Sequence, residues 1–174
     1  MKNMQNSHNP GHASEHGPHN SKHNSGMYKR FAVMAVAMFA AMYFIMYAMI
    51  DGWQNLIPNI NNLYMTLLMT SAMLLIELLI MKVMYANRKM NWVIAIISVA
   101  IGIFSWFGIR EQINVGDKQF VKGMIPHHAA AILMSEKAHL TDPELLELQK
   151  NILETQEEEI ELMKRKLKEF EYNK

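Results

Sequence analysis

The sequence contains no cysteine and carries almost no net charge. The absence of cysteine excludes a disulfide scaffold, a thiolate metal site and a thiol nucleophile. A formal net charge of +1 over 174 residues provides no electrostatic footprint for nucleic acid, so nucleic acid is excluded as a partner. The mean hydropathy of −0.03 conceals three unlike segments: polar, His-rich residues 1–30, almost uncharged residues 31–109 and charged residues 110–174. The last segment is too short to build a large enzyme core by itself.

Charge is nearly absent from three long hydrophobic runs. Residues 31–50 contain no charge, proline or glycine, and a helix of this length crosses about 30 Å of hydrocarbon. Residues 63–81, interrupted only by Glu77, and residues 92–109 are the second and third runs. The first run is too long for a signal peptide and lacks a small-residue cleavage site. We therefore predict three retained transmembrane helices in a cell membrane, with the lipid bilayer as a partner.

The basic residues that flank the runs indicate how the chain crosses the membrane. Six lie in the leader and in the loop between the second and third runs: Lys22, Lys29, Arg30, Lys82, Arg88 and Lys89. Three lie just after the third run: Arg110, Lys118 and Lys122. Since loops rich in Lys and Arg remain in the cytoplasm, we predict a cytoplasmic N-terminus and an extracytoplasmic C-terminal domain.

Residues 117–171 predict a helical hairpin. Side chains that recur every three or four residues share one face of its first helix: Phe120, Met124, His127, Ala131, Met134 and Ala138. A second series has the same spacing: Leu145, Leu148, Ile152, Gln156, Ile160, Met163, Leu167 and Phe170. Two such helices joined by a short turn form an antiparallel αα-hairpin. The predicted fold class is therefore all-α.

Local signals predict the ends of the two hairpin helices and their partner. Asp117 is predicted to cap the first helix, and Pro126 to kink it by removing a backbone bond to Lys122. Residues 141–144 predict a capping box, with Pro143 in the first turn of the second helix. The apolar face needs a partner. We predict a homodimer that forms a four-helix bundle across a two-fold axis, with docking onto the spans as the alternative.

The hairpin resembles a known bacterial family. The resemblance is carried by Asp117, Phe120, the run Met124-Ile125-Pro126-His127-His128 and Ala131, followed by Gln156, Glu159, Ile160 and Met163. These residues resemble the domain of unknown function 305, over the last third of the chain. The resemblance implies a ferritin-like bundle, usually extracytoplasmic, which in the CopM-like members binds copper and supports copper resistance. It implies no established enzymatic reaction, and it says nothing of the spans or the leader.

Methionine and histidine determine the chemistry that the hairpin offers. Thioether and imidazole are the ligand pair that suits Cu(I), and two adjacent imidazoles need polar partners if they are buried. Together with the resemblance, they predict an extracytoplasmic copper site, with Cu(I) as the expected ion. The candidate ligands are His127, His128, Met124, Met134, Met163, Gln156 and Glu159. The alternative is that the methionines only fill the core.

The first two spans carry methionine at every fourth position. The first row is Met34, Met38, Met42 and Met46, and the second is Met65, Met69, Met73, Glu77 and Met81. Because four residues turn only about 40° around a helix, each row stays on one slowly drifting face. Two facing rows would form a thioether path for Cu(I), with Glu77 as its ionisable group. Packing of abundant methionines between helices is the alternative.

Residues 1–30 predict a disordered tail. Its composition of Asn, Ser, Gly and Pro does not form a core, and its histidines either hold copper or zinc loosely or remain solvated. These histidines are His8, His12, His16, His19 and His23.

The leading functional prediction is a membrane-anchored copper-binding protein, not an enzyme, that buffers the ion or delivers it to a copper transporter. A structural or sensory membrane protein without metal chemistry is the alternative. The third reading is a ferritin-like di-metal oxidase, because Glu136 and His139 have the Glu-x-x-His spacing of such sites. Against it, Glu136 is directed away from the predicted apolar face.

Overall fold

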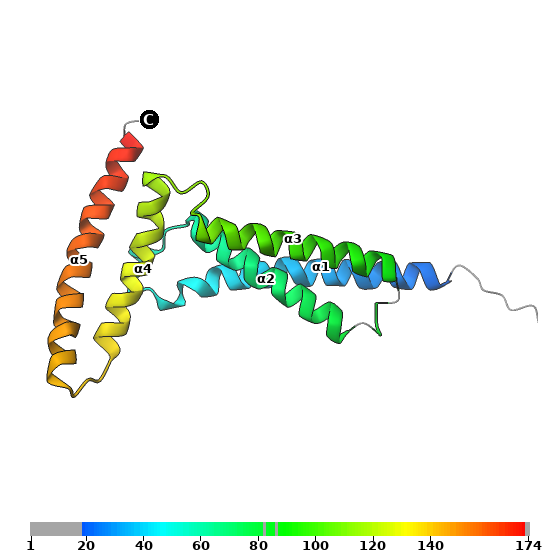
Figure 1. Cartoon of the computed structure of the whole chain (residues 1–174), viewed down its shortest axis with the longest axis horizontal. Coiled ribbons are helices and arrows are strands. Elements are labelled where there is room, and N and C mark those ends of the chain that lie inside the picture. Colours follow the sequence, from blue (N-terminus) through cyan, green and yellow to red (C-terminus); the bar gives the residue numbers. More distant parts are fainter. Residues whose placement is uncertain (1–18, 82, 86, 173–174) are drawn as a thin grey trace, which may run out of the picture.

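The computed structural model describes residues 19–81, 83–85 and 87–172, and the regular structure in these ranges is all helical (Figure 1). In chain order the elements are α1 (His19–Ile45), η1 (Met46–Met49), η2 (Trp53–Asn55), α2 (Ile60–Ile80), α3 (Arg88–Arg110), α4 (Asp117–Lys137) and α5 (Pro143–Tyr172), where η denotes a 3₁₀ helix. No strand occurs in the described ranges, which confirms the predicted all-α class.

Three segments of the described chain are long and apolar enough to cross a membrane: Gly26–Met49, Ile60–Ile80 and Arg88–Arg110. They confirm the three predicted spans, although all three begin earlier than predicted, the second and third because of caps. Asn59 caps α2 because its side-chain oxygen accepts a hydrogen bond from the Asn62 amide at 2.8 Å. Asn87 caps α3 in the same way, accepting from the Met90 amide at 3.2 Å. Asparagine is a strongly preferred N-cap, so the caps rather than the apolar runs set these boundaries.

The first helix begins inside the predicted disordered tail. It starts at His19 instead of Phe31, so the prediction of disorder is wrong for residues 19–30. Extending an existing helix is easier than nucleating one, and the apolar run of α1 supplies the helix that this polar segment extends. Residues 1–18, with three of the tail's histidines, lie outside the described residues.

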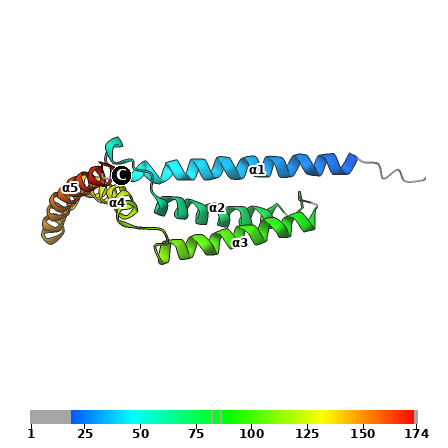
Figure 2. The same cartoon turned by 90° about the horizontal axis from the view of Figure 1, so that it is seen from above.

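The spans lie in a row, with α2 between α1 and α3 (Figure 2). Small and polar side chains are buried along the middle helix and its neighbour α3: Thr66, Thr70, Ser71, Ser98 and Ser105. Such residues let two helix backbones approach closely inside a membrane. The tightest packing of α2 is therefore against α3 rather than against α1.

Gly108 of α3 is a position where this close approach leaves no room for a side chain. A Cβ there would lie 3.0 Å from three ring atoms of Tyr64, whose hydroxyl donates to the Ile113 carbonyl at 3.0 Å. Since the ring is buried and held at its far end, Gly108→Ala is expected to lower the free energy of unfolding by about 1–3 kcal/mol. Thermal unfolding in detergent measures the loss. The control is Gly26→Ala, at a helical glycine with nothing within 4 Å, and equal destabilisation by both variants would contradict the prediction.

Two long helices follow the spans and lie side by side across their ends (Figure 1). The second of them, α5, is capped by Asp142, whose Oδ1 accepts hydrogen bonds from the amides of Glu144 at 2.9 Å and Leu145 at 3.1 Å. Pro143 is the first helical residue, as predicted. The cap is therefore Asp142 and not Thr141, because the Asp142 carboxylate accepts from the amides in the first turn of α5.

The start of α4 also differs from the prediction by one residue. Gly116 occupies the cap position without a side-chain bond, and Asp117 is the first helical residue. An acidic residue in the first turn still interacts favourably with the helix dipole. The helix runs on past Pro126 to Lys137, so proline removes one backbone bond without ending the helix.

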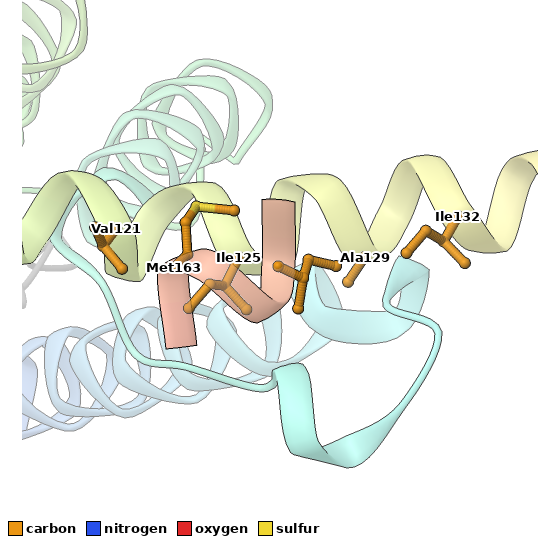
Figure 3. Packing of buried hydrophobic residues seen from close by; sticks show 6 residues of the cluster. Val121, Ile125, Ala129, Ile132 and Met163 are labelled. Atoms are coloured by element: carbon orange, nitrogen blue, oxygen red, sulfur yellow. The ribbon is translucent and has the colours of Figure 1, made fainter. Parts of the chain in front are cut away.

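The core between α4 and α5 is built from branched aliphatic side chains (Figure 3). Its buried members are Val121, Ile125, Ala129, Ile132, Ile160 and Met163. On α4 this face lies one residue beyond the predicted one, since Phe120 and Met134 of the predicted face are 54% and 55% exposed. Two apolar stripes lie next to each other on α4, and α5 covers the stripe of branched residues. The predicted stripe, which contains His127, is not covered by α5.

The α4 helix also docks onto the ends of the spans. It packs against η1, η2 and the start of α2, and Ile50 and Ile57 from the connecting segment pack against the α4–α5 core. The Gln119 side chain accepts a hydrogen bond from the Ile60 amide at 3.3 Å. Docking onto the spans, the predicted alternative to dimerisation, therefore occurs within the single chain.

Candidate functional site

The two adjacent histidines of α4 leave the helix in different directions. Consecutive residues are about 100° apart around a helix, and the two ring centroids are 6.3 Å apart with their planes at 62°. His128 is buried toward α5, whereas His127 is exposed and lines a cavity on the side of the spans. The predicted ligands therefore fall into two separate sets.

The first set contains His128, which uses both ring nitrogens within the protein. Its Nδ1 lies 2.9 Å from the Met124 carbonyl oxygen, and its Nε2 lies 2.7 Å from Glu159 Oε2. In a typical metal-ligating histidine, one ring nitrogen donates a hydrogen bond to a group such as a backbone carbonyl, and the other ring nitrogen binds the metal. Here the carboxylate already occupies that second nitrogen. The side chain of His128 therefore ties α4 to α5.

The other predicted residues of this set are only partly joined to it. The Gln156 side-chain amide donates to Glu159 Oε2 at 3.5 Å, which places both next to the His128 ring. Met163 is buried in the α4–α5 core, and Met124 packs half-buried against that core. Within the described residues, no group of three or more His, Asp or Glu side chains is placed to hold a metal ion. The sequence-predicted ligands do not form one metal centre.

The second set surrounds a cavity of about 400 Å³ between α4 and the ends of the first two spans. We call it the junction pocket. His127 and Met134 enter it from α4, while Met46 and Met49 come from η1 and Met65 from α2. One imidazole and four thioethers thus line a single cavity.

Close packing of α4 on the start of α2 brings these elements together. A Cβ at Gly123 would lie 3.4 Å from the Asn61 side-chain nitrogen, which is an ordinary van der Waals distance and shows that α4 and the start of α2 are in contact here. Pro126, which lines the cavity, lies one residue before His127. The 3₁₀ helix η1 follows α1 directly and carries Met46 and Met49 to the same side as Met65.

The lining of the junction pocket is uncharged and mainly apolar. Among the described residues it contains no Asp, Glu, Lys or Arg, and its polar members besides His127 are asparagines and a tyrosine. The side-chain oxygen of Asn61 is buried without a hydrogen-bond partner among the described residues, so one acceptor there is unused. Met134 is 55% exposed, and His127 is exposed beside it. The α4 side of the pocket is therefore open to solvent.

Three of these methionines were not among the predicted hairpin ligands, although Met46 and Met65 were predicted as members of the thioether path through the spans. Met46 and Met65 are end members of the two methionine rows, and that position is the signal that would have pointed to them. Met49 lies outside both rows and has no such signal. Sequence spacing identifies faces of single helices, whereas the junction pocket needs the packing of three elements.

The remaining predicted residues lie elsewhere. Glu77 accepts a hydrogen bond from the Tyr85 hydroxyl at 3.0 Å, near the end of the spans that is remote from α4. Burial, with Glu77 as hydrogen-bond partner and negative neighbour, raises the pKa of Tyr85 to about 12, so the phenol keeps its proton at neutral pH. Because α4 ends at Lys137, Glu136 and His139 are not on one helical turn, and both are exposed.

Comparisons with known proteins place the chain among relatives without assigned activity. The family model described as "Domain of unknown function (DUF305)" matches residues 110–167. The "Uncharacterized protein L153" of Acanthamoeba polyphaga mimivirus is 34% identical over 137 residues, which cover 75% of this chain and 86% of the relative. That match is longer than the part of the chain after α3, so it extends into the spans. No solved structure matches.

Proposed function

Because the chain belongs to the DUF305 family, whose description names no activity, we propose its function from the junction pocket: it is a membrane-anchored protein that binds copper as Cu(I). The observation that supports this is the convergence of His127 with four methionines on one cavity. Copper is the cargo, to be buffered, delivered or kept from causing damage, and no chemical transformation is required of the protein.

The donor set of the pocket favours a soft monovalent ion. Thioether sulfur and imidazole nitrogen suit Cu(I), whereas Mg²⁺, Ca²⁺ and Mn²⁺ prefer carboxylate and carbonyl oxygen. The lining has no carboxylate, which disfavours harder divalent ions. Neutral ligands also leave no unpaired charge at the edge of the membrane while the pocket is empty. His127 and Met134 would supply ligands from α4, and Met46, Met49 and Met65 would supply them from the ends of the spans.

We further propose that the pocket lies on the outer face of a cell membrane. The greater number of basic residues at the opposite end of the spans supports a cytoplasmic N-terminus, which places α4 and α5 outside. A copper transporter in the same membrane is the proposed recipient of the ion.

The α5 helix keeps four leucine side chains that are 45–52% exposed: Leu145, Leu146, Leu148 and Leu162. Their apolar surface supports the proposal that two copies pair through ferritin-like hairpins, in addition to the docking within each chain.

His127 provides the test of this function, and the contact between His128 and Glu159 provides its control. Purified full-length protein in lipid nanodiscs is titrated with Cu(I) in competition with a chelator. His127→Ala is expected to lower the affinity by at least about 10-fold, because losing even a supporting partner of a metal ligand costs about 10–100-fold. Glu159→Gln, which retains a side-chain oxygen to accept from His128, is the matched control and should bind like the wild type.

A wild-type affinity no tighter than micromolar, or equal affinities for His127→Ala and wild type, would contradict the proposal. The second candidate function, a structural or sensory membrane protein, would then be favoured. The specific observation behind it is the His128–Glu159 contact of 2.7 Å, which holds α4 and α5 together without a metal.

A further inference from the structure

The methionine rows of α1 and α2 continue from the junction pocket into the membrane. Met46 and Met65, the first member of each row on this side, both line the pocket. One turn deeper, the Thr70 hydroxyl donates to the Met42 sulfur at 3.9 Å. At the far end, Met34 packs against the cluster that contains Leu78. These contacts fix the pairing of the two helices at three depths.

This pairing places the two rows at matching depths. The helices run antiparallel (Figure 2), so four residues back along α1 correspond to four residues forward along α2. Counting in steps of four from these positions puts Met46 level with Met65, Met42 with Met69, Met38 with Met73, and Met34 with Glu77. Each step is about 6 Å along the helix axis. We call these four levels the methionine seam.

The methionine side chains of the seam are not fully buried between the spans. Met65, Met69 and Met73 are 37%, 41% and 42% exposed, and Met34, Met38 and Met42 are half-buried. The buried surface of α2 is supplied instead by hydroxyl residues such as Thr66 and Ser71. A residue that serves only to fill a core would be expected on that buried surface.

The seam ends at a carboxylate. Glu77 is level with Met34, and its Oε1 accepts from the Tyr85 hydroxyl at 3.0 Å. A hydrogen-bond network holds the same end of the spans, where the Tyr28 hydroxyl donates to Asn91 Oδ1 at 2.7 Å. An ionisable residue inside a membrane marks a pathway for ions or protons in many membrane proteins. Here it offers one negative charge to balance one monovalent cation.

We propose that the methionine seam conducts Cu(I) between the junction pocket and Glu77, which makes the protein a copper permeation pathway as well as a copper binder. The proposal rests on the proposed function, because the pocket must first collect the ion. Each level presents neutral thioethers, so the ion is held weakly at several sites in succession, as conduction requires. The ion remains Cu(I) throughout, and no electron is transferred.

The test measures flux and binding on the same proteins. Full-length protein is reconstituted in phosphatidylcholine vesicles that contain an impermeant Cu(I)-selective dye, with Cu(I) and ascorbate outside. The seam variant replaces Met38, Met42, Met69 and Met73 with leucine, which leaves a gap of about 18 Å between the pocket and the last level. The control variant replaces Met27, Met84 and Met90, at the far end of the spans, with leucine.

The wild type and the control variant are expected to fill the vesicles faster than protein-free vesicles. In the seam variant, the rate of Cu(I) entry is expected to be at least about 10-fold lower than in the wild type. Its junction pocket is expected to bind Cu(I) with unchanged affinity. Wild-type flux equal to that of protein-free vesicles, with binding intact, would overturn the permeation pathway alone. A seam variant that conducts like the wild type would overturn it as well. If the wild-type protein does not bind Cu(I), the proposed function itself is refuted.

Discussion

Full-length protein in which Met46, Met49 and Met65 are all leucine is expected to bind Cu(I) at least about 100-fold more weakly than the wild type, a loss of about 2.7 kcal/mol of binding free energy. These residues supply three of the four thioethers that line the junction pocket. With only His127 and the exposed Met134 left, the ion would have two protein ligands. Leucine keeps the volume and the hydrophobicity of methionine, so the replacement removes sulfur with little change in packing.

Competition with a Cu(I) chelator measures this loss, and circular dichroism of the same samples shows whether the helices remain. The matched control is the triple leucine variant of Met27, Met84 and Met90, which removes the same number of sulfur atoms from the opposite end of the spans. A similar loss of affinity in both triple variants would mean that copper binds methionine without regard to position, and the junction pocket would not be the site.

Replacing His128 with alanine is expected to produce the largest loss of stability, about 2–4 kcal/mol. The ring is 9% exposed, and its removal leaves a cavity in the α4–α5 core. It also removes the hydrogen bonds to the Met124 carbonyl and to Glu159. Because the Glu159 side chain is 48% exposed, water replaces part of the lost contact, which keeps the cost below that of a fully buried pair.

Hydrogen exchange of the α4 and α5 amides measures the loss of stability in the two helices that His128 joins. The amides of α2 and α3 provide the internal reference. Glu159→Gln, which keeps an acceptor for the ring, is expected to cost less than about 1 kcal/mol. His128→Ala with wild-type protection in α4 and α5 would show that the contact does not hold the two helices together.

Local sequence signals predicted the elements well. The spans follow from uncharged runs whose length matches the hydrocarbon thickness, and α5 from apolar residues at helical spacing that follow Pro143. The errors are at the ends of elements. The helices α2, α3 and α5 begin after their caps Asn59, Asn87 and Asp142, and not where their apolar patterns begin. A cap depends on one side chain that reaches a backbone amide, and the apolar pattern does not report this.

The candidate site was predicted only in part. The residue types and the positions of His127 and Met134 were evident from the sequence, as was the chemistry of thioether with imidazole. The pairing of His128 with Glu159 had a weaker signal, since both were candidate ligands but not partners of each other. Met49 had no signal, because it belongs to no row and its role depends on a helix distant in the sequence.

The sequence by itself determined an all-helical chain with three spans and a soft donor set, because hydrophobic length and helical period are local properties. The tertiary structure decided which of two neighbouring apolar stripes on α4 packs against α5. That choice turned His128 inward and left His127 facing η1 and α2. The fit of branched side chains between α4 and α5, and the docking of α4 on the spans, determine which stripe is buried.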